Sequence, residues 1–425
     1  MLRPSTASSR GGRRRDIRGH VSRLFGFALL PAFSFLASLV ILPIISAKFG
    51  APAWSMVALG QSTGAIASIV VGLTWAVEGG NLVAGLGAHE RGQVYVRSVA
   101  SQLIVFLIAG VVTGVITYVL APTYKWEAVV FALANTLGGF TAAWYYSGVG
   151  TPRPLLINEG LVRMLGYVAA LVAILAGGGL MWYATTGMAA AVVSILANWW
   201  TIVIRRGAHI PRTIVRDAWR TVQEEWFGTA ARLIQSVYSF GGPSLFAILH
   251  PSGLAAYSGA RTVQVTAANA LSAVPNAFVS WVGSQRGERL KERVRLTNRL
   301  MAVTGVLIFL GVALLGQVVL NYLFAHRLTL GFGDRVLLAI AIAFAFYNRA
   351  YQLLVLVPLG QKALIYRSTM VSSLIGLGLY CVLIPALGVT GGLLVPPAVF
   401  IGLQVRYRLS MARLQRIGAL EPLDA

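Results

Sequence analysis

Six ionisable side chains lie inside the apolar segments of this 425-residue sequence rather than in its polar loops. They are Glu78, Glu159, Arg163, Arg232, Arg261 and Arg349. A charge at the centre of a membrane helix costs about 2.5–3.5 kcal/mol on insertion scales, so such residues usually face a water-filled cavity or a partner. Four arginines against two acids make this set cationic, and arginine can bind phosphate oxygens through two parallel hydrogen bonds. The set therefore predicts an anion site within a membrane.

Glu159 and Arg163 are four residues apart, so they share one face of a helix and each lowers the insertion cost of the other. We expect that face to border a hydrated cleft open to the cytoplasm. Arg163 lies about eight residues, or about 12 Å, from the inner boundary of its segment. Snorkelling to the head groups, or simple pairing with Glu159, is therefore the alternative for Arg163.

The other four have structural alternatives of different weight. Arg232 lies near the inner end of its segment and Arg261 near the outer end of another, so both can reach head groups. Arg349 is about mid-depth, far from either interface, which favours a cavity. Glu78 precedes two glycines and is either a helix-packing acceptor or a protonatable coupling group.

The elements that must position these residues are membrane helices. The chain is 57% hydrophobic and 11% charged, whereas soluble domains have about 25% charged residues. A helix needs about 20 apolar residues to cross the hydrocarbon core, and the apolar runs lack the alternation of barrel strands. Twelve such runs cover residues 24–48, 54–86, 96–121, 126–149, 155–176, 180–204, 228–250, 255–284, 297–322, 335–359, 364–386 and 390–410. The predicted class is an all-α integral membrane protein with twelve transmembrane helices.

The distribution of basic residues predicts the orientation. With residue 1 in the cytoplasm, 27 of the 35 Lys and Arg fall on inner segments and four at outer ends, as the positive-inside rule requires. Both termini are then cytoplasmic, with an Arg-rich tail over residues 1–23 and a second tail over residues 411–425. The net charge of +22 thus reflects topology and anionic lipids at the inner loops, not nucleic acid.

Residues 205–227 form the longest inner connection and divide the chain into six helices (24–204) and six helices (228–410). Val215, Trp219, Val222 and Trp226 recur at helical spacing with arginines between them. This pattern predicts an amphipathic helix at the inner interface among anionic head groups, with a solvated linker as the alternative.

Weak internal similarity supports two related six-helix bundles. "FGAPAWSMVALGQS" at 49–62 and "HPSGLAAYSGARTVQV" at 250–265 each place a glycine before an aromatic residue and a serine. "SGVGTPRPLL" at the fourth–fifth junction likewise matches "VPLGQKALI" at the tenth–eleventh. Duplicated halves with a site between them are a recurrent transporter architecture.

No enzyme motif is present in the sequence: there is no P-loop, no G-x-S-x-G and no paired histidine ligands. The five histidines are scattered and the single cysteine excludes a disulfide framework. The predicted outer loops are too short to build a catalytic domain. We therefore expect no enzyme activity, no metal and no cofactor.

Three stretches resemble the polysaccharide-translocating flippases, which export O-antigen and teichoic-type lipid-linked oligosaccharides and belong to the multidrug/oligosaccharidyl-lipid/polysaccharide exporter superfamily. They are "SAKFGAPAWSMVALGQSTGAIASIVVGLTWAVEGG", "AAWYYSGVGTPRPLLINEGLVRMLGYVAALVAI" and "YCVLIPALGVTGGLLV". The resemblance implies alternating access in a bacterial cytoplasmic membrane, with a cationic central cavity for the cargo's diphosphate and sugars. It implies substrate contact by Arg349, Arg163, Arg261 and Arg232, and orienting or coupling roles for Glu159 and Glu78. Polysaccharide assembly proteins are possible partners.

Two alternatives stay open. A cation-coupled drug or metabolite exporter of the same superfamily is expected to have acidic residues in its cavity, whereas arginine outnumbers acid here. A non-transporting scaffold of a polysaccharide assembly complex is compatible with the same sequence.

Overall fold

The computed structural model describes residues 9–283 and 287–416, with side chains described from Val40 onward except at positions 88, 231, 273, 277, 280 and 283. Every regular element in these ranges is a helix. The α-helices are α1 (Ser9–Val71), α2 (Trp75–Ala84), α3 (Ala88–Leu120), α4 (Lys125–Thr136), α5 (Ala143–Val149), α6 (Pro152–Leu155), α7 (Val162–Leu175), α8 (Met181–Trp199), α9 (Ile214–Phe240), α10 (Gly242–Leu249), α11 (Leu254–Leu271), α12 (Ala273–Gly283), α13 (Glu288–Leu323), α14 (Phe332–Tyr351) and α15 (Lys362–Arg416). Short turns of 3₁₀-helix lie at Leu137–Phe140 and Pro251–Gly253, and π-helix lies at Leu156–Leu161, Trp200–Ile204 and Gln352–Leu356.

The all-helical prediction is confirmed for the described residues, and the apolar runs fall on helices. Within residues 9–283 and 287–416, eight helices are long and apolar enough to cross a membrane, so the count of twelve spans stays a prediction. Two long helices contain a glycine outside helical geometry: Gly50 (φ 81°) in α1 and Gly388 (φ 57°) in α15. A positive φ is accessible to glycine without steric cost, so the helix can be interrupted at these positions. Each of the two glycines lies between two consecutive apolar runs.

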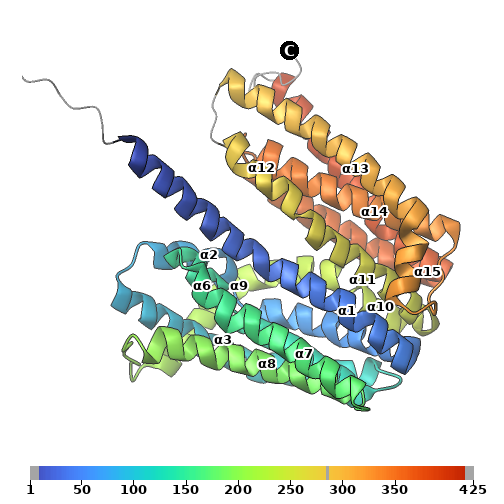
Figure 1. Ribbon diagram of the computed structural model, residues 1–425, viewed down its shortest axis with the longest axis horizontal. Helices are drawn as coiled ribbons and strands as arrows, with labels where there is room; N and C mark the ends of the chain where they lie inside the picture. The colour runs from blue at the N-terminus through green and yellow to red at the C-terminus, as the bar shows by residue number, and fades with distance from the viewer. Residues whose placement is uncertain (1–8, 284–286, 417–425) are drawn as a thin grey trace, which may run out of the picture.

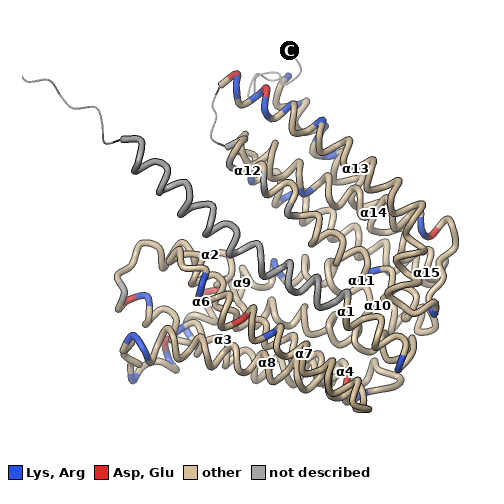
Figure 2. The backbone as a smooth tube through the Cα atoms, viewed as in Figure 1, with Lys and Arg blue, Asp and Glu red and all other residues tan. Residues whose placement is uncertain are grey.

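The outer faces of these helices are apolar. Leu107, Val111, Leu165 and Leu314 expose 56–71% of their surface. Charged residues lie mostly at the ends of helices, as the tube coloured by charge shows (Figure 2). An apolar surface of this extent on helices of spanning length is the pattern of a multi-pass membrane protein.

The first-half helices (α1–α8) lie on one side of the molecule and the second-half helices (α10–α15) on the other (Figure 1). Buried apolar side chains form three clusters. One lies wholly within residues 71–203 and another within residues 282–411. The third joins α1 to α11, α14 and α15, and includes Ile45, Leu59, Tyr257 and Val395. Each half thus has its own core, and a shared core holds the halves together.

The segments that showed internal similarity occupy related places. Trp54 and Tyr257 are both buried, at 5% and 1% exposure, and α1 packs against α11 between the halves. Gly150 and Gly360, from the second pair of similar segments, have nearly equal positive φ values of 74° and 75°. The same left-handed turn therefore follows the fourth and the tenth apolar runs.

Two of the differences between predicted and observed helix boundaries concern the candidate site. The run 54–86 is broken, because α1 ends at Val71 and α2 begins at Trp75 after a turn in which Leu73 has φ 49°. The amphipathic stretch within 205–227 continues without a break into the seventh run as the single helix α9. Helix propensity allows this continuity because no proline or left-handed residue separates the two segments.

Candidate functional site: a cationic chamber between the halves

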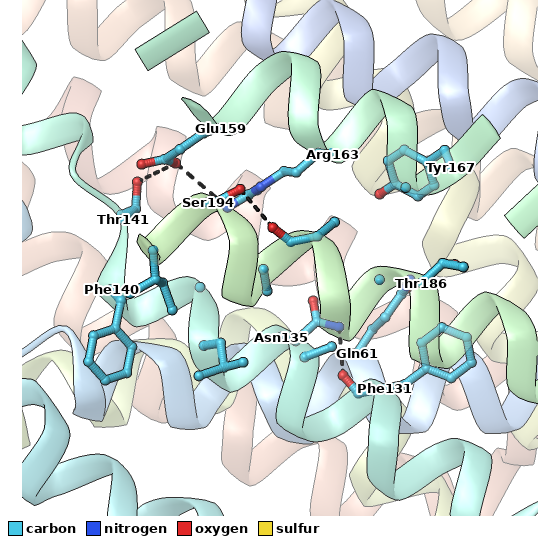
Figure 3. A pocket seen from close by; sticks show the side chains of 18 of the residues that line it. Gln61, Phe131, Asn135, Phe140, Thr141, Glu159, Arg163, Tyr167, Thr186 and Ser194 are labelled. Carbon is cyan, nitrogen blue, oxygen red and sulfur yellow. Dashed lines mark hydrogen bonds and ion pairs between the residues drawn. The ribbon is translucent and has the colours of Figure 1, made fainter. Parts of the chain in front are cut away.

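Glu159 belongs to the π-helical turn before α7 and is 4% exposed. Its carboxylate accepts hydrogen bonds from the Thr141 hydroxyl (2.8 Å), the Ala142 amide (2.8 Å) and the Asn198 side chain (3.0 Å). Arg163 lies 3.7 Å from it, with 45% of its side chain exposed. Figure 3 shows both side chains at the wall of a cavity of about 150 Å³ within the first half. The carboxylate is fully engaged with protein donors, while the guanidinium is available to the cavity.

Removal of this carboxylate is expected to destabilise the protein. In Glu159→Ala the Ala142 amide and the Asn198 side chain lose their acceptor, and each buried group left unpaired costs about 1–3 kcal/mol. We expect a clear fall in the midpoint of thermal unfolding in detergent. Glu224→Ala is the matched control, because Glu224 pairs with Arg220 on the exposed surface, where a pair contributes about 0–1 kcal/mol. Equal midpoints for the two variants contradict the buried network.

A second cavity, of about 520 Å³, lies between the halves. Its walls come from α1, α4, α7 and α8 on one side and α9–α11 on the other. Arg261 is the charged residue of this lining. Its guanidinium donates to the Gln264 side chain (2.7 Å) and to the Ser239 carbonyl (2.5 Å). These bonds hold the cation inside the protein, so the predicted snorkelling to outer head groups is not needed to explain its position.

A third cavity, of about 740 Å³, lies in the second half. Arg232, Arg349 and Lys362 line it, and its lining contains no acidic residue. Arg232 donates to the Leu73 carbonyl. Arg349 is exposed to the cavity, and no described residue forms a hydrogen bond or ion pair with its guanidinium. This cavity has more cations in its lining than either of the other two.

These spaces adjoin one another through shared walls. The first-half and interhalf cavities share Gln61, Asn135, Tyr167 and Tyr183. A fourth cavity, of about 400 Å³, shares Asn269 with the interhalf cavity and Arg349 with the second-half cavity. We call the four cavities together the central chamber. Five cations and one carboxylate line it, and that carboxylate is Glu159.

Five of the six residues singled out from the sequence line this chamber; Glu78 does not. It lies in the first turn of α2, is exposed and lines none of the cavities described above. Its predicted position deep in a long helix is wrong, because α1 ends before it. Lys362 is the cation that sequence reasoning missed. It lies between the predicted runs 335–359 and 364–386, directly after the Gly360 turn, and its closeness to a glycine turn at the start of an apolar run is the one local signal for a cavity position.

The chain matches no protein-family model and no curated protein. Solved structures do match. An inward-facing multidrug resistance transporter of the multidrug and toxin extrusion (MATE) family shares 16% of its residues, covers 95% of this chain and 99% of its own, and superposes with a TM-score of 0.57. The eukaryotic MATE transporter AtDTX14 is 13% identical over 93% of this chain and 100% of its own, with a TM-score of 0.48. The protein therefore has the fold of the MATE family transporters of the MOP superfamily.

Proposed function

We propose that this protein is a membrane transporter that moves a polyprenyl-diphosphate-linked oligosaccharide, or a related surface-polysaccharide precursor, across the cytoplasmic membrane by alternating access. The observation that carries the proposal is the charge of the central chamber. Its lining contains five cations and a single carboxylate, and protein donors already saturate that carboxylate. A diphosphate carries at least two negative charges, and arginine holds phosphate oxygens with charge-assisted bonds. The function that we propose is translocation, without enzyme activity.

The layout of the chamber also suits the two parts of such a cargo. The diphosphate would occupy the second-half cavity beside Arg349 and Lys362. Amide and phenol groups of Gln61, Asn135 and Tyr167 line the neighbouring cavities, and these groups can donate to and accept from sugar hydroxyls. The lipid tail would remain in the bilayer.

The fold likeness also favours a second candidate, an exporter of drugs or metabolites, because the inward-facing neighbour is described as a multidrug resistance transporter. Many such cargoes are cations, and the chamber's excess of positive charge repels them. An exporter of anionic drugs or metabolites fits the same chamber, so the cargo must be tested directly. A scaffold role would not use the chamber at all.

Helix α9 supports a further partner, the anionic lipid surface. Val215, Trp219 and Trp226 expose 71%, 50% and 52% of their surface, while Ala218 and Thr221 on another face are buried. Tryptophan and arginine side by side on an exposed helix suit the head-group region of an anionic leaflet. The resemblance of the sequence to the polysaccharide-translocating flippases also leads us to propose polysaccharide assembly proteins as partners.

The test is reconstitution of the full chain in liposomes. A fluorescent short-chain polyprenyl-diphosphate oligosaccharide is placed in both leaflets of the liposomes. An impermeant quencher is then added outside, and the fraction of total fluorescence that it removes is followed over time, because translocation brings lipid from the inner leaflet to the quencher. We expect protein-dependent translocation of this lipid and no uptake of the cation ethidium. Ethidium movement without lipid translocation supports the drug exporter and contradicts our proposal. Movement of neither supports the scaffold.

A further inference from the structure

We propose that Arg232 is a latch between the two halves that the anionic cargo releases. This inference rests on the proposed function, because it assigns a second role to a chamber cation. Arg232 lines the second-half cavity together with Arg349 and Lys362. In the structure its guanidinium is instead engaged by the carbonyl of Leu73, in the turn between α1 and α2.

Three positions on one face of α9 hold this turn. Glu225 accepts from the Thr74 amide (3.0 Å) and the Thr74 hydroxyl (2.6 Å). At Gly228 a Cβ atom would come within 2.9 Å of the Thr74 methyl group, so only glycine allows this approach. Arg232 completes the set with its bond to Leu73. Residues 225, 228 and 232 follow helical spacing, so one face of one helix clamps one turn.

The turn itself is held in an unfavourable conformation. Leu73 is fully buried and has φ 49°, a left-handed conformation that residues with a side chain rarely adopt. Such a conformation persists only where surrounding contacts hold it in place. Removing the charged donor at the Leu73 carbonyl therefore weakens the clamp where the backbone most needs support.

The far end of α9 belongs to the second half. Tyr238 packs so closely against α15 that a Cβ on Gly376 would lie 2.3 Å from its ring, and the Ser239 carbonyl accepts from Arg261. One helix thus contacts the α1–α2 turn at residues 225–232 and the second half at residues 238–239, while its last residue, Phe240, accepts a hydrogen bond from Ser62 of α1. Release of the first contact separates the α1–α2 turn from a helix that the second half retains.

The cargo can compete for Arg232 because of the chemistry of the acceptors. A carbonyl is a neutral acceptor, and that of Leu73 accepts one bond from Arg232, whereas a phosphate is charged and accepts two parallel bonds from a guanidinium, each about twice as strong. A diphosphate beside Arg349 and Lys362 would therefore draw Arg232 away from Leu73. The cargo then binds the unlatched state more tightly than the latched one, and such differential affinity is what shifts a conformational equilibrium.

The experiment measures hydrogen exchange of the Thr74 amide, whose acceptor is Glu225 in the latch. The full chain is compared with and without inorganic pyrophosphate, and binding is followed separately by calorimetry. We expect exchange over residues 72–78 to speed up by about fivefold or more, the lower end of ordinary coupling between sites. The Gly87 amide, which donates to the Glu90 carboxylate at 3.0 Å away from the chamber, is the internal reference and is expected not to change.

Two variants separate the latch from general electrostatics. Arg232→Gln loses the charge and shortens the side chain, so its basal exchange over residues 72–78 is expected to be faster than in the wild type, while the response to pyrophosphate disappears. Arg216→Gln removes a cation from an exposed position of α9 outside the chamber lining and is expected to preserve the response. Loss of the response in both variants contradicts a specific role for Arg232.

The failure of the latch and the failure of the proposed function are distinguishable. If pyrophosphate binds and the exchange of residues 72–78 stays constant, the latch is wrong and the anion chamber stands. If neither pyrophosphate nor farnesyl diphosphate binds at all, the proposed function and the latch both fall.

Discussion

A disulfide between positions 62 and 244 is expected to abolish transport until it is reduced. The hydroxyl oxygens of Ser62 in α1 and Ser244 in α10 lie 2.8 Å apart, and Ser62 also donates to the Phe240 carbonyl. A sulfur–sulfur bond of about 2.05 Å fits this approach with little movement. Alternating access requires the two halves to move relative to each other, so a covalent bond between them should arrest the cycle. Translocation by Ser62→Cys/Ser244→Cys is measured under oxidation and again after dithiothreitol.

A second cysteine pair provides the matched control. The hydroxyls of Thr63 and Thr117 lie 2.7 Å apart, and both residues belong to the first half. In a Cys381→Ser background, oxidised Thr63→Cys/Thr117→Cys is expected to keep translocating the lipid, because the bond lies within one half. If both disulfides arrest transport, the arrest does not depend on movement between the halves and the prediction is wrong. If neither disulfide arrests transport, α1 and α10 do not separate during the cycle.

Arg349→Ala is expected to lower the translocation rate of the diphosphate-linked lipid by about tenfold or more. Hydrogen bonds to charged groups contribute about 1.5–3 kcal/mol, and about 1.4 kcal/mol corresponds to a factor of ten. Arg349 lines two cavities of the chamber. No described residue forms a hydrogen bond or ion pair with its guanidinium, so removal of this side chain should leave the amount of folded protein unchanged. The rate is measured in liposomes at equal protein content.

Arg367→Ala is the control for charge alone. Arg367 is an exposed cation near the start of α15 and lines none of the chamber's cavities, so its removal is expected to leave the rate near wild type. An Arg349→Ala protein as active as Arg367→Ala means that the second-half cavity does not hold the cargo.

Local sequence patterns predicted the helices well and the residues of the candidate site only in part. The apolar runs are helical because twenty consecutive apolar residues carry that information without any long-range contact. Gly50, Gly150, Gly360 and Gly388 mark breaks or turns where the sequence predicted junctions. Arg349 and Arg261 line cavities, because a charge within an apolar run has few other places that are energetically acceptable.

The position predicted for a charged residue differs from the structure where that position depends on the exact end of a helix. Glu78 follows an uninterrupted apolar run, yet a left-handed turn at Leu73 ends α1 and leaves Glu78 exposed. Lys362 lies between two predicted apolar runs, and only the structure shows that it follows the Gly360 turn and lines the chamber. The turn at Leu73 has no local signal, because leucine is rare in such a conformation.

By itself the sequence determined that the chain is an all-helical membrane protein with arginines inside its apolar segments, since hydropathy and charge are properties of consecutive residues. Only the tertiary structure decided that the Glu159 carboxylate is saturated by Thr141, Ala142 and Asn198. It alone decided that Arg232 is engaged by a carbonyl of the α1–α2 turn. Partners that are 17 to 159 residues apart in the chain meet only through the packing of whole helices, which no local pattern specifies.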